Sequence, residues 1–202
     1  MSDEPLLPCL KEPAWSGRDA VVARPLWRES SPYVPWVALG YERAGAIEFL
    51  GRDRAANRDA GELEREALAN LRRREASWQE LRLELGGFKN LRMLAAADDV
   101  LAAERILDPA FLEEAQRQLR APGLFVGIPR RAFLVVTAFD TIVERCHAFG
   151  AVVATQFQGA ESDPITPLLF TARNGRLVGT VDVVARAIVP PESMSGEPAA
   201  GA

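Results

Sequence analysis

Short apolar segments joined by tight turns are the feature that most constrains the fold of this chain. The clearest pair is Leu168–Arg173 and Arg176–Val184, which flank Asn174-Gly175. Asn-Gly is the preferred sequence of a type I′ turn, because both central residues of that turn need positive φ. Similar apolar runs flank the turns at 42–45 and 129–131. Consecutive hairpins of this kind predict an antiparallel sheet.

Other segments also have the composition of strands. They are Ala20–Ala23, Trp78–Leu85, Leu91–Ala95, Val100–Leu107 and Ala151–Phe157. Alternating apolar and polar residues over 81–85 favour a strand there. For Val100–Leu107 a helix is the alternative, because its alanines and glutamate favour helix.

Three segments have helical patterns. Gly61–Arg74 repeats apolar residues at spacings of three and four, with acids early and arginines late. Asp108-Pro109 provides an N-cap and a first-turn proline for a helix that ends near Leu119. Asp140 is expected to cap a short helix that ends near Phe149, with Gly150 as its C′ residue. We therefore predict an α+β fold, with a largely antiparallel sheet of hairpins and about three helices packed on one face.

The distribution of proline, glycine and small polar residues predicts the domain organisation. Residues 1–19 are proline-interrupted and are expected to form a flexible leader. Residues 20–189 are expected to form a single α+β domain, with a subdomain break near 107–123 as an alternative. Residues 190–202 are small and polar and are expected to be disordered.

The charge and cysteine content excludes several classes of function. The net charge of −4 argues against nucleic-acid binding, which usually needs a basic surface. Two distant cysteines, Cys9 and Cys146, suggest reduced thiols and a cytoplasmic location. No apolar run is long enough to span a membrane. His147 is the only histidine, and we expect it to be a helix-surface or boundary residue.

No catalytic residues, metal ligands or cofactor motif are predicted. Neither a Walker A sequence nor a dinucleotide-binding glycine motif is present. The strongest candidate site is Arg130-Arg131, held between two apolar strands, because planar guanidinium groups bind carboxylate or phosphate well. Asp163, Thr166 and Arg173 are the polar residues expected to join this anion-binding or partner-binding site. Two solvent-exposed loop arginines are the alternative.

The second half of the chain resembles the YtpQ-like family of uncharacterised bacterial proteins. The resemblance rests on PGLFVGIPRRAFLVV (122–136), DPITPLLFTARNGRLV (163–178) and EALANL (66–71), in that order, and covers about residues 60–180. The family favours a Pro-x-Arg-Asp turn, of which Pro129 and Arg131 match while Ala132 replaces the acid. It also favours serine where this chain has Thr166. The resemblance implies a fold and a cytoplasmic setting but no chemistry.

Three hypotheses of function follow from these observations. The first is a non-enzymatic binding or protein-interaction domain with an unknown protein partner, because no catalytic set, metal site or cofactor loop is present. The second is a small-anion-binding protein or an enzyme with a site centred on Arg130 and Arg131. The third is nucleic-acid binding through arginines such as Arg72-Arg73-Arg74, against which the acidic charge balance counts.

Overall fold

The computed structural model describes residues 4–28, 31–43, 45–85, 88–97, 99–139, 143–161 and 163–181. Within these ranges the strands are β1 (Leu6–Lys11), β2 (Ala23–Pro25), β3 (Trp36–Arg43), β4 (Ala46–Phe49), β5 (Gln79–Leu85), β6 (Phe88–Ala96), β7 (Leu124–Arg130), β8 (Phe133–Ala138), β9 (Leu169–Arg173) and β10 (Arg176–Val181). The α-helices are α1 (Ala60–Arg72), α2 (Pro109–Leu119) and α3 (Val143–Gln158), and the 3-10 helices are η1 (Ser16–Asp19) and η2 (Ala103–Leu107). The predicted α+β class is confirmed.

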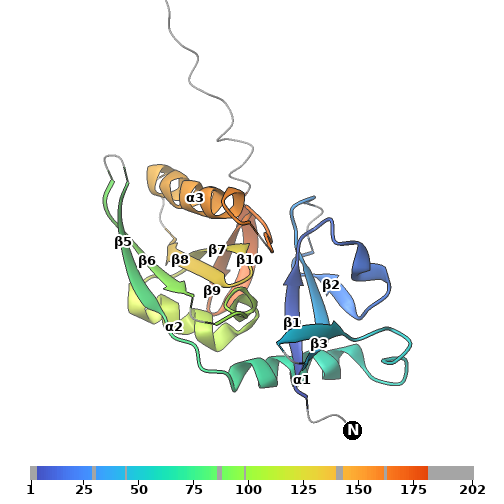
Figure 1. The fold of residues 1–202 in the computed structure, drawn as a ribbon. Coiled ribbons are helices and arrows are strands. Elements are labelled where there is room, and N and C mark those ends of the chain that lie inside the picture. Colours follow the sequence, from blue (N-terminus) through green and yellow to red (C-terminus); the bar gives the residue numbers. More distant parts are fainter. Residues whose placement is uncertain are drawn as a thin grey trace, which may run out of the picture.

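The strands form two antiparallel sheets that lie side by side (Figure 1). In the first sheet β1 and β2 both pair with β3, and β4 pairs with β3 as well. The second sheet has the order β10-β9-β7-β8-β6-β5. The chain passes from the first sheet to the second between β4 and β5. The alternative break near 107–123 instead falls on α2, within the part of the chain that builds the second sheet.

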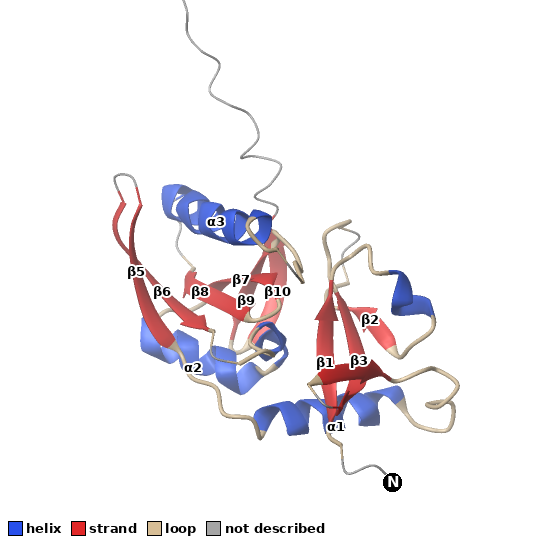
Figure 2. Cartoon of the chain, in the orientation of Figure 1, coloured by secondary structure: helices blue, strands red, loops and turns tan. Residues whose placement is uncertain are grey.

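The helices do not all lie on one face of a sheet, which corrects that expectation. Helix α1 packs on the first sheet, while α2 and α3 cover opposite faces of the second sheet (Figure 2). The reason is the pattern of β7 and β8, in which both sets of alternating residues are apolar. Val126 and Val136 contribute to the core on the α2 side, and Phe125 and Val135 to the core on the α3 side. A strand buried on both faces needs a cover on each.

Helix α3 corrects two sequence predictions. We expected a helix to end near Phe149 and a strand at Ala151–Phe157, but the helix runs through Gly150 to Gln158. The apolar run that suggested a strand belongs to a helix face, because Phe149 and Val153 are spaced by four residues and are both fully buried against the sheet. The predicted cap, Asp140, lies outside the described residues.

The predicted flexible leader contains strand β1, which corrects that expectation. Leu6, Leu7 and Leu10 are buried, and β1 pairs with β3 along its length. Pro8 suggested a loop but is tolerated because β1 is an edge strand. The Leu6 carbonyl and the Leu10 N–H both bind side chains away from β3, so the Pro8 nitrogen faces the same outer edge.

Other local predictions are confirmed. Asp108 caps α2 with Pro109 in the first turn, and α1 covers most of the predicted helix at 61–74. The structure adds that Asp59 caps α1 by accepting from Glu62 N–H. Asn174 and Gly175 have φ of 48° and 68°, as a type I′ turn requires. By contrast, Val100–Leu107, predicted as a strand, contains the 3-10 helix η2.

Two further sequence expectations concern a membrane-spanning segment and the C-terminal tail. Among the described residues, no helix combines the length and the apolar character needed to cross a membrane. The predicted disordered tail, residues 190–202, lies outside the described residues.

Candidate functional site between the two sheets

A cavity of about 230 Å³ lies where the two sheets meet, and we call it the inter-sheet pocket. The β3–β4 hairpin contributes one wall, and the segments around η2, the β7–β8 turn and Asp163 contribute the other. Its lining residues are Glu42, Gly45, Ile47, Val100, Leu101, Arg130, Arg131, Ala132 and Asp163. Ligand pockets are common at such junctions between structural units.

Backbone hydrogen bonds fix Arg131 at this junction. Its N–H donates to the Asp163 carbonyl at 3.2 Å, and its carbonyl accepts from Ala103 N–H at 3.1 Å. The turn between β7 and β8 is therefore tied to the loop before β9 and to η2. This arrangement brings together Arg130, Arg131 and Asp163, three of the residues proposed from the sequence.

The side chains of Arg130 and Arg131 form no ion pair with any described residue. Arg131 Nε is buried and has no hydrogen-bond partner there, and Arg130 lies 5.3 Å from the centroid of the Phe133 ring. Many other arginines do have carboxylate partners. They are Arg24, Arg43, Arg54, Arg58, Arg65, Arg72, Arg74, Arg92 and Arg105. The pocket arginines thus keep donors available for a ligand.

A buried carboxyl group, that of Glu104 in η2, lies close to Arg131. Glu104 Oε1 accepts from Leu10 N–H at 2.9 Å, whereas Oε2 has no partner among the described residues. Burial raises the pKa of Glu104 to about 7, although the Leu10 hydrogen bond and the charge of Arg131 act in the opposite direction. A carboxyl group in this state can exchange a proton near neutral pH.

The Cys9 thiol belongs to the same neighbourhood. It is fully buried on β1, and burial together with the negative charge of Glu104 raises its pKa to about 12. The nucleophile of cysteine chemistry is the thiolate. Cys9 is therefore held as the unreactive thiol and acts as a small apolar residue of the core.

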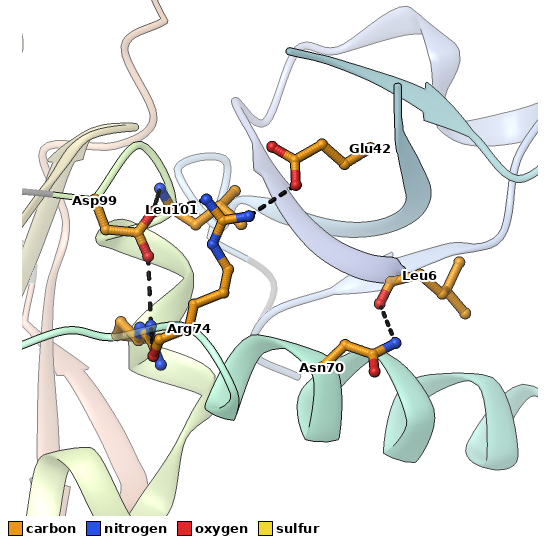
Figure 3. Close-up of polar contacts among 7 residues, drawn as sticks. Leu6, Glu42, Asn70, Arg74, Asp99 and Leu101 are labelled. Atoms are coloured by element: carbon orange, nitrogen blue, oxygen red, sulfur yellow. Dashed lines mark hydrogen bonds and ion pairs between the residues drawn. The ribbon is translucent and has the colours of Figure 1, made fainter. Parts of the chain in front are cut away.

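Arg74 links the two sheets at one side of the pocket. Its guanidinium binds Glu42 of β3 at 2.7 Å and lies 3.6 Å from Asp99, next to η2 (Figure 3). Arg105 donates to the Arg74 carbonyl at 2.7 Å. Glu42 therefore has a cationic partner already, so its charge is largely balanced.

Asp163 has no such partner among the described residues. It is exposed at the pocket and has a positive φ of 54°. Asp and Asn are the side chains that tolerate this backbone conformation best. The pocket thus presents two guanidinium groups and one carboxylate that form no ion pair with any described residue.

Two residues proposed from the sequence lie away from the pocket lining. Thr166 is fully buried; its hydroxyl donates to the Tyr33 carbonyl at 2.7 Å and accepts from Leu168 N–H at 3.1 Å. It therefore fixes a loop. Arg173 is exposed beside Phe139, and the β7–β9 register places it at the opposite end of the sheet from Arg130.

The remaining sequence candidates have structural explanations. Arg72 binds Asp108, Arg73 binds Asn70, and Arg74 binds Glu42 and Asp99, so this run is largely occupied within the protein. His147 is exposed on α3. No group of three potential metal ligands occurs among the residues that the structure describes.

Sequence reasoning missed Glu42 and Glu104. Glu42 was assigned to a polar turn, and its role depends on contact with Arg74, 32 residues away. One signal could have indicated Glu104: Glu104-Arg105 interrupts an otherwise apolar run from Leu101 to Leu107. Charges inside an apolar run are either exposed or hold a specific partner, and here both are buried.

Comparisons of the chain with models of known protein families, with curated protein sequences and with solved structures found no match. The resemblance to the YtpQ-like family therefore stays a prediction.

Proposed function

We propose that this protein binds a small anionic ligand, a carboxylate or a phosphate, in the inter-sheet pocket. The observation that carries the proposal is the pair of guanidinium groups, Arg130 and Arg131, which line a cavity and lack an ion-pair partner among the described residues. A guanidinium group that has lost part of its hydration is stabilised by a charged hydrogen-bond partner. A ligand anion would provide that partner.

The size of the cavity supports a small ligand. Its volume of about 230 Å³ is below the roughly 300–1,000 Å³ of pockets that hold drug-sized molecules. Small metabolites are a better match. The reduced thiol of Cys9 fits a cytoplasmic setting, which remains part of this proposal.

A protein-interaction domain has less support. The described part of the chain exposes three large apolar side chains, Tyr33, Val100 and Val178, on separate segments of sequence. Protein partners usually cover a contiguous apolar patch. Val100 itself lies at the pocket, where a small ligand would cover it.

Isothermal titration calorimetry of the full chain tests the proposal, with acetate, succinate and phosphate as probes. We expect the wild-type protein to bind at least one of them. The Arg130→Gln/Arg131→Gln variant should lose roughly tenfold to 100-fold in affinity per charged hydrogen bond removed, equivalent to about 1.5–3 kcal/mol. Glutamine preserves much of the side-chain length while removing the charge.

Arg173→Gln is the matched control, because Arg173 is exposed at the other end of the sheet. It should bind as the wild type does. Circular dichroism melts should show that all variants are folded. Binding that is unchanged in the double variant, or a wild type that binds none of the probes, would refute the proposal.

A further inference from the structure

The polar lining of the inter-sheet pocket carries both signs of charge. Arg130 and Arg131 are cationic, and Asp163 is an anion without a cationic partner among the described residues. A ligand with only negative charge would bind the arginines beside a carboxylate that repels it. A ligand that also carries an ammonium group would satisfy Asp163 as well.

The remaining wall of the pocket is apolar. Ile47, Val100 and Ala132 line it together with the buried Leu101. Val100 is 58% exposed at the edge of this wall. A short aliphatic group of a ligand would remove this side chain from water, which is favourable in proportion to the apolar area covered.

We propose that the ligand is a small zwitterion of the aliphatic α-amino acid class. Its carboxylate binds Arg130 and Arg131, its ammonium group binds Asp163, and its side chain contacts Val100 and Leu101. This inference rests on the proposed anion site and extends it by naming the second charge and the apolar part of the ligand.

Three probes separate the two charges of such a ligand. L-Valine has both, N-acetyl-L-valine has only the carboxylate, and L-valinamide has only the ammonium group. Calorimetry should rank L-valine tightest, on the order of tenfold or more above N-acetyl-L-valine, the change typical of one charged hydrogen bond.

Asp163→Asn is the informative variant, because asparagine tolerates the positive φ of this position. It should abolish the preference for L-valine over N-acetyl-L-valine while leaving the affinity for N-acetyl-L-valine unchanged or higher. A variant that keeps the preference for L-valine, or that loses binding to both probes, would contradict the role given to Asp163.

The outcomes distinguish the zwitterion inference from the anion site on which it rests. Equal binding of L-valine and N-acetyl-L-valine to the wild type would overturn the zwitterion and leave the anion site intact. Binding of L-valinamide alone would overturn both, as would the absence of binding by all three probes together with acetate, succinate and phosphate.

Discussion

Glu104 has an ionisation behaviour that differs from that of an ordinary glutamate. Its carboxyl group is fully buried, with one oxygen hydrogen-bonded to Leu10 and the other without a described partner. Burial favours the neutral form, which explains the rise of its pKa from 4.5 to about 7. Because the unfolded chain releases this proton at lower pH than the folded chain does, Glu104 makes stability depend on pH.

The sign of this dependence can be predicted. Glu104 supports folding below the unfolded pKa, and its contribution is lost as the pH rises from 4.5 to about 7. The loss should be roughly 3 kcal/mol, or about 6–12 °C in melting temperature for a chain of this size. Glu104→Gln cannot titrate, so the melting temperature of the wild type relative to this variant should fall over that window and then level off. A difference that does not vary with pH would show that Glu104 is not buried as described.

Gly175 is required for two separate reasons. Its φ is +68°, and a Cβ there would lie 2.3 Å from the Pro109 carbonyl oxygen of α2. Gly45 has a comparable φ of +81° with nothing within 4 Å, and so isolates the backbone effect. In urea denaturation, Gly45→Ala should cost about 1 kcal/mol. Gly175→Ala should cost roughly 1–3 kcal/mol more because of the contact. Equal losses would mean that the β9–β10 turn does not pack against α2.

At the level of elements, sequence patterns succeeded where local chemistry decides the structure. Helices α1 and α2 have capping side chains next to them in sequence, and the β9–β10 turn has Asn-Gly. Sequence patterns failed where tertiary packing decides the structure. The apolar second half of α3 suggested a strand. Pro8 suggested a loop in place of β1, because its position on the sheet edge depends on a pairing with a segment about 30 residues away.

The approach of α3 to the second sheet depends on Gly127. A Cβ at this position would lie 2.4 Å from Val153 Cγ2. Gly127→Ala should therefore destabilise the protein by roughly 1–3 kcal/mol, because helix and sheet must separate. Combining it with Val153→Ala should recover part of that loss, so a double-mutant cycle in urea should give a coupling of about 1 kcal/mol or more. Strictly additive losses would contradict this packing.

At the scale of the whole molecule, side chains from η2 and from the end of α1 connect the two sheets. Glu104 reaches β1, and Arg74 binds both Glu42 and Asp99. These partners are separated in the sequence by 25 residues (Arg74 and Asp99) to 94 residues (Leu10 and Glu104). No local pattern can predict such contacts, so the sequence suggested a single sheet.

In the pocket, too, local sequence patterns indicated some residues, while others depend on contacts between distant segments. Arg130 and Arg131 could be singled out because they follow each other in one turn, and Asp163 because it is a polar residue of the loop before β9. The opposite wall, formed by the β3–β4 hairpin, depends on how the two sheets meet. Thr166 and Arg173 are close to Asp163 in sequence, yet one is buried in a loop contact and the other lies at the far end of β9.

We propose that the Arg130 and Arg131 guanidinium groups bind an anion in the inter-sheet pocket. Nitrogen-15 NMR of the arginine Nε–Hε groups tests it most directly, with resonances assigned from Arg130→Gln, Arg131→Gln and Arg173→Gln and with acetate and L-valine as probes. We expect the Arg130 and Arg131 resonances to shift in a saturable manner and that of Arg173 to stay unchanged. Shifts confined to Arg173, or no saturable shift of either pocket arginine with either probe, would contradict it.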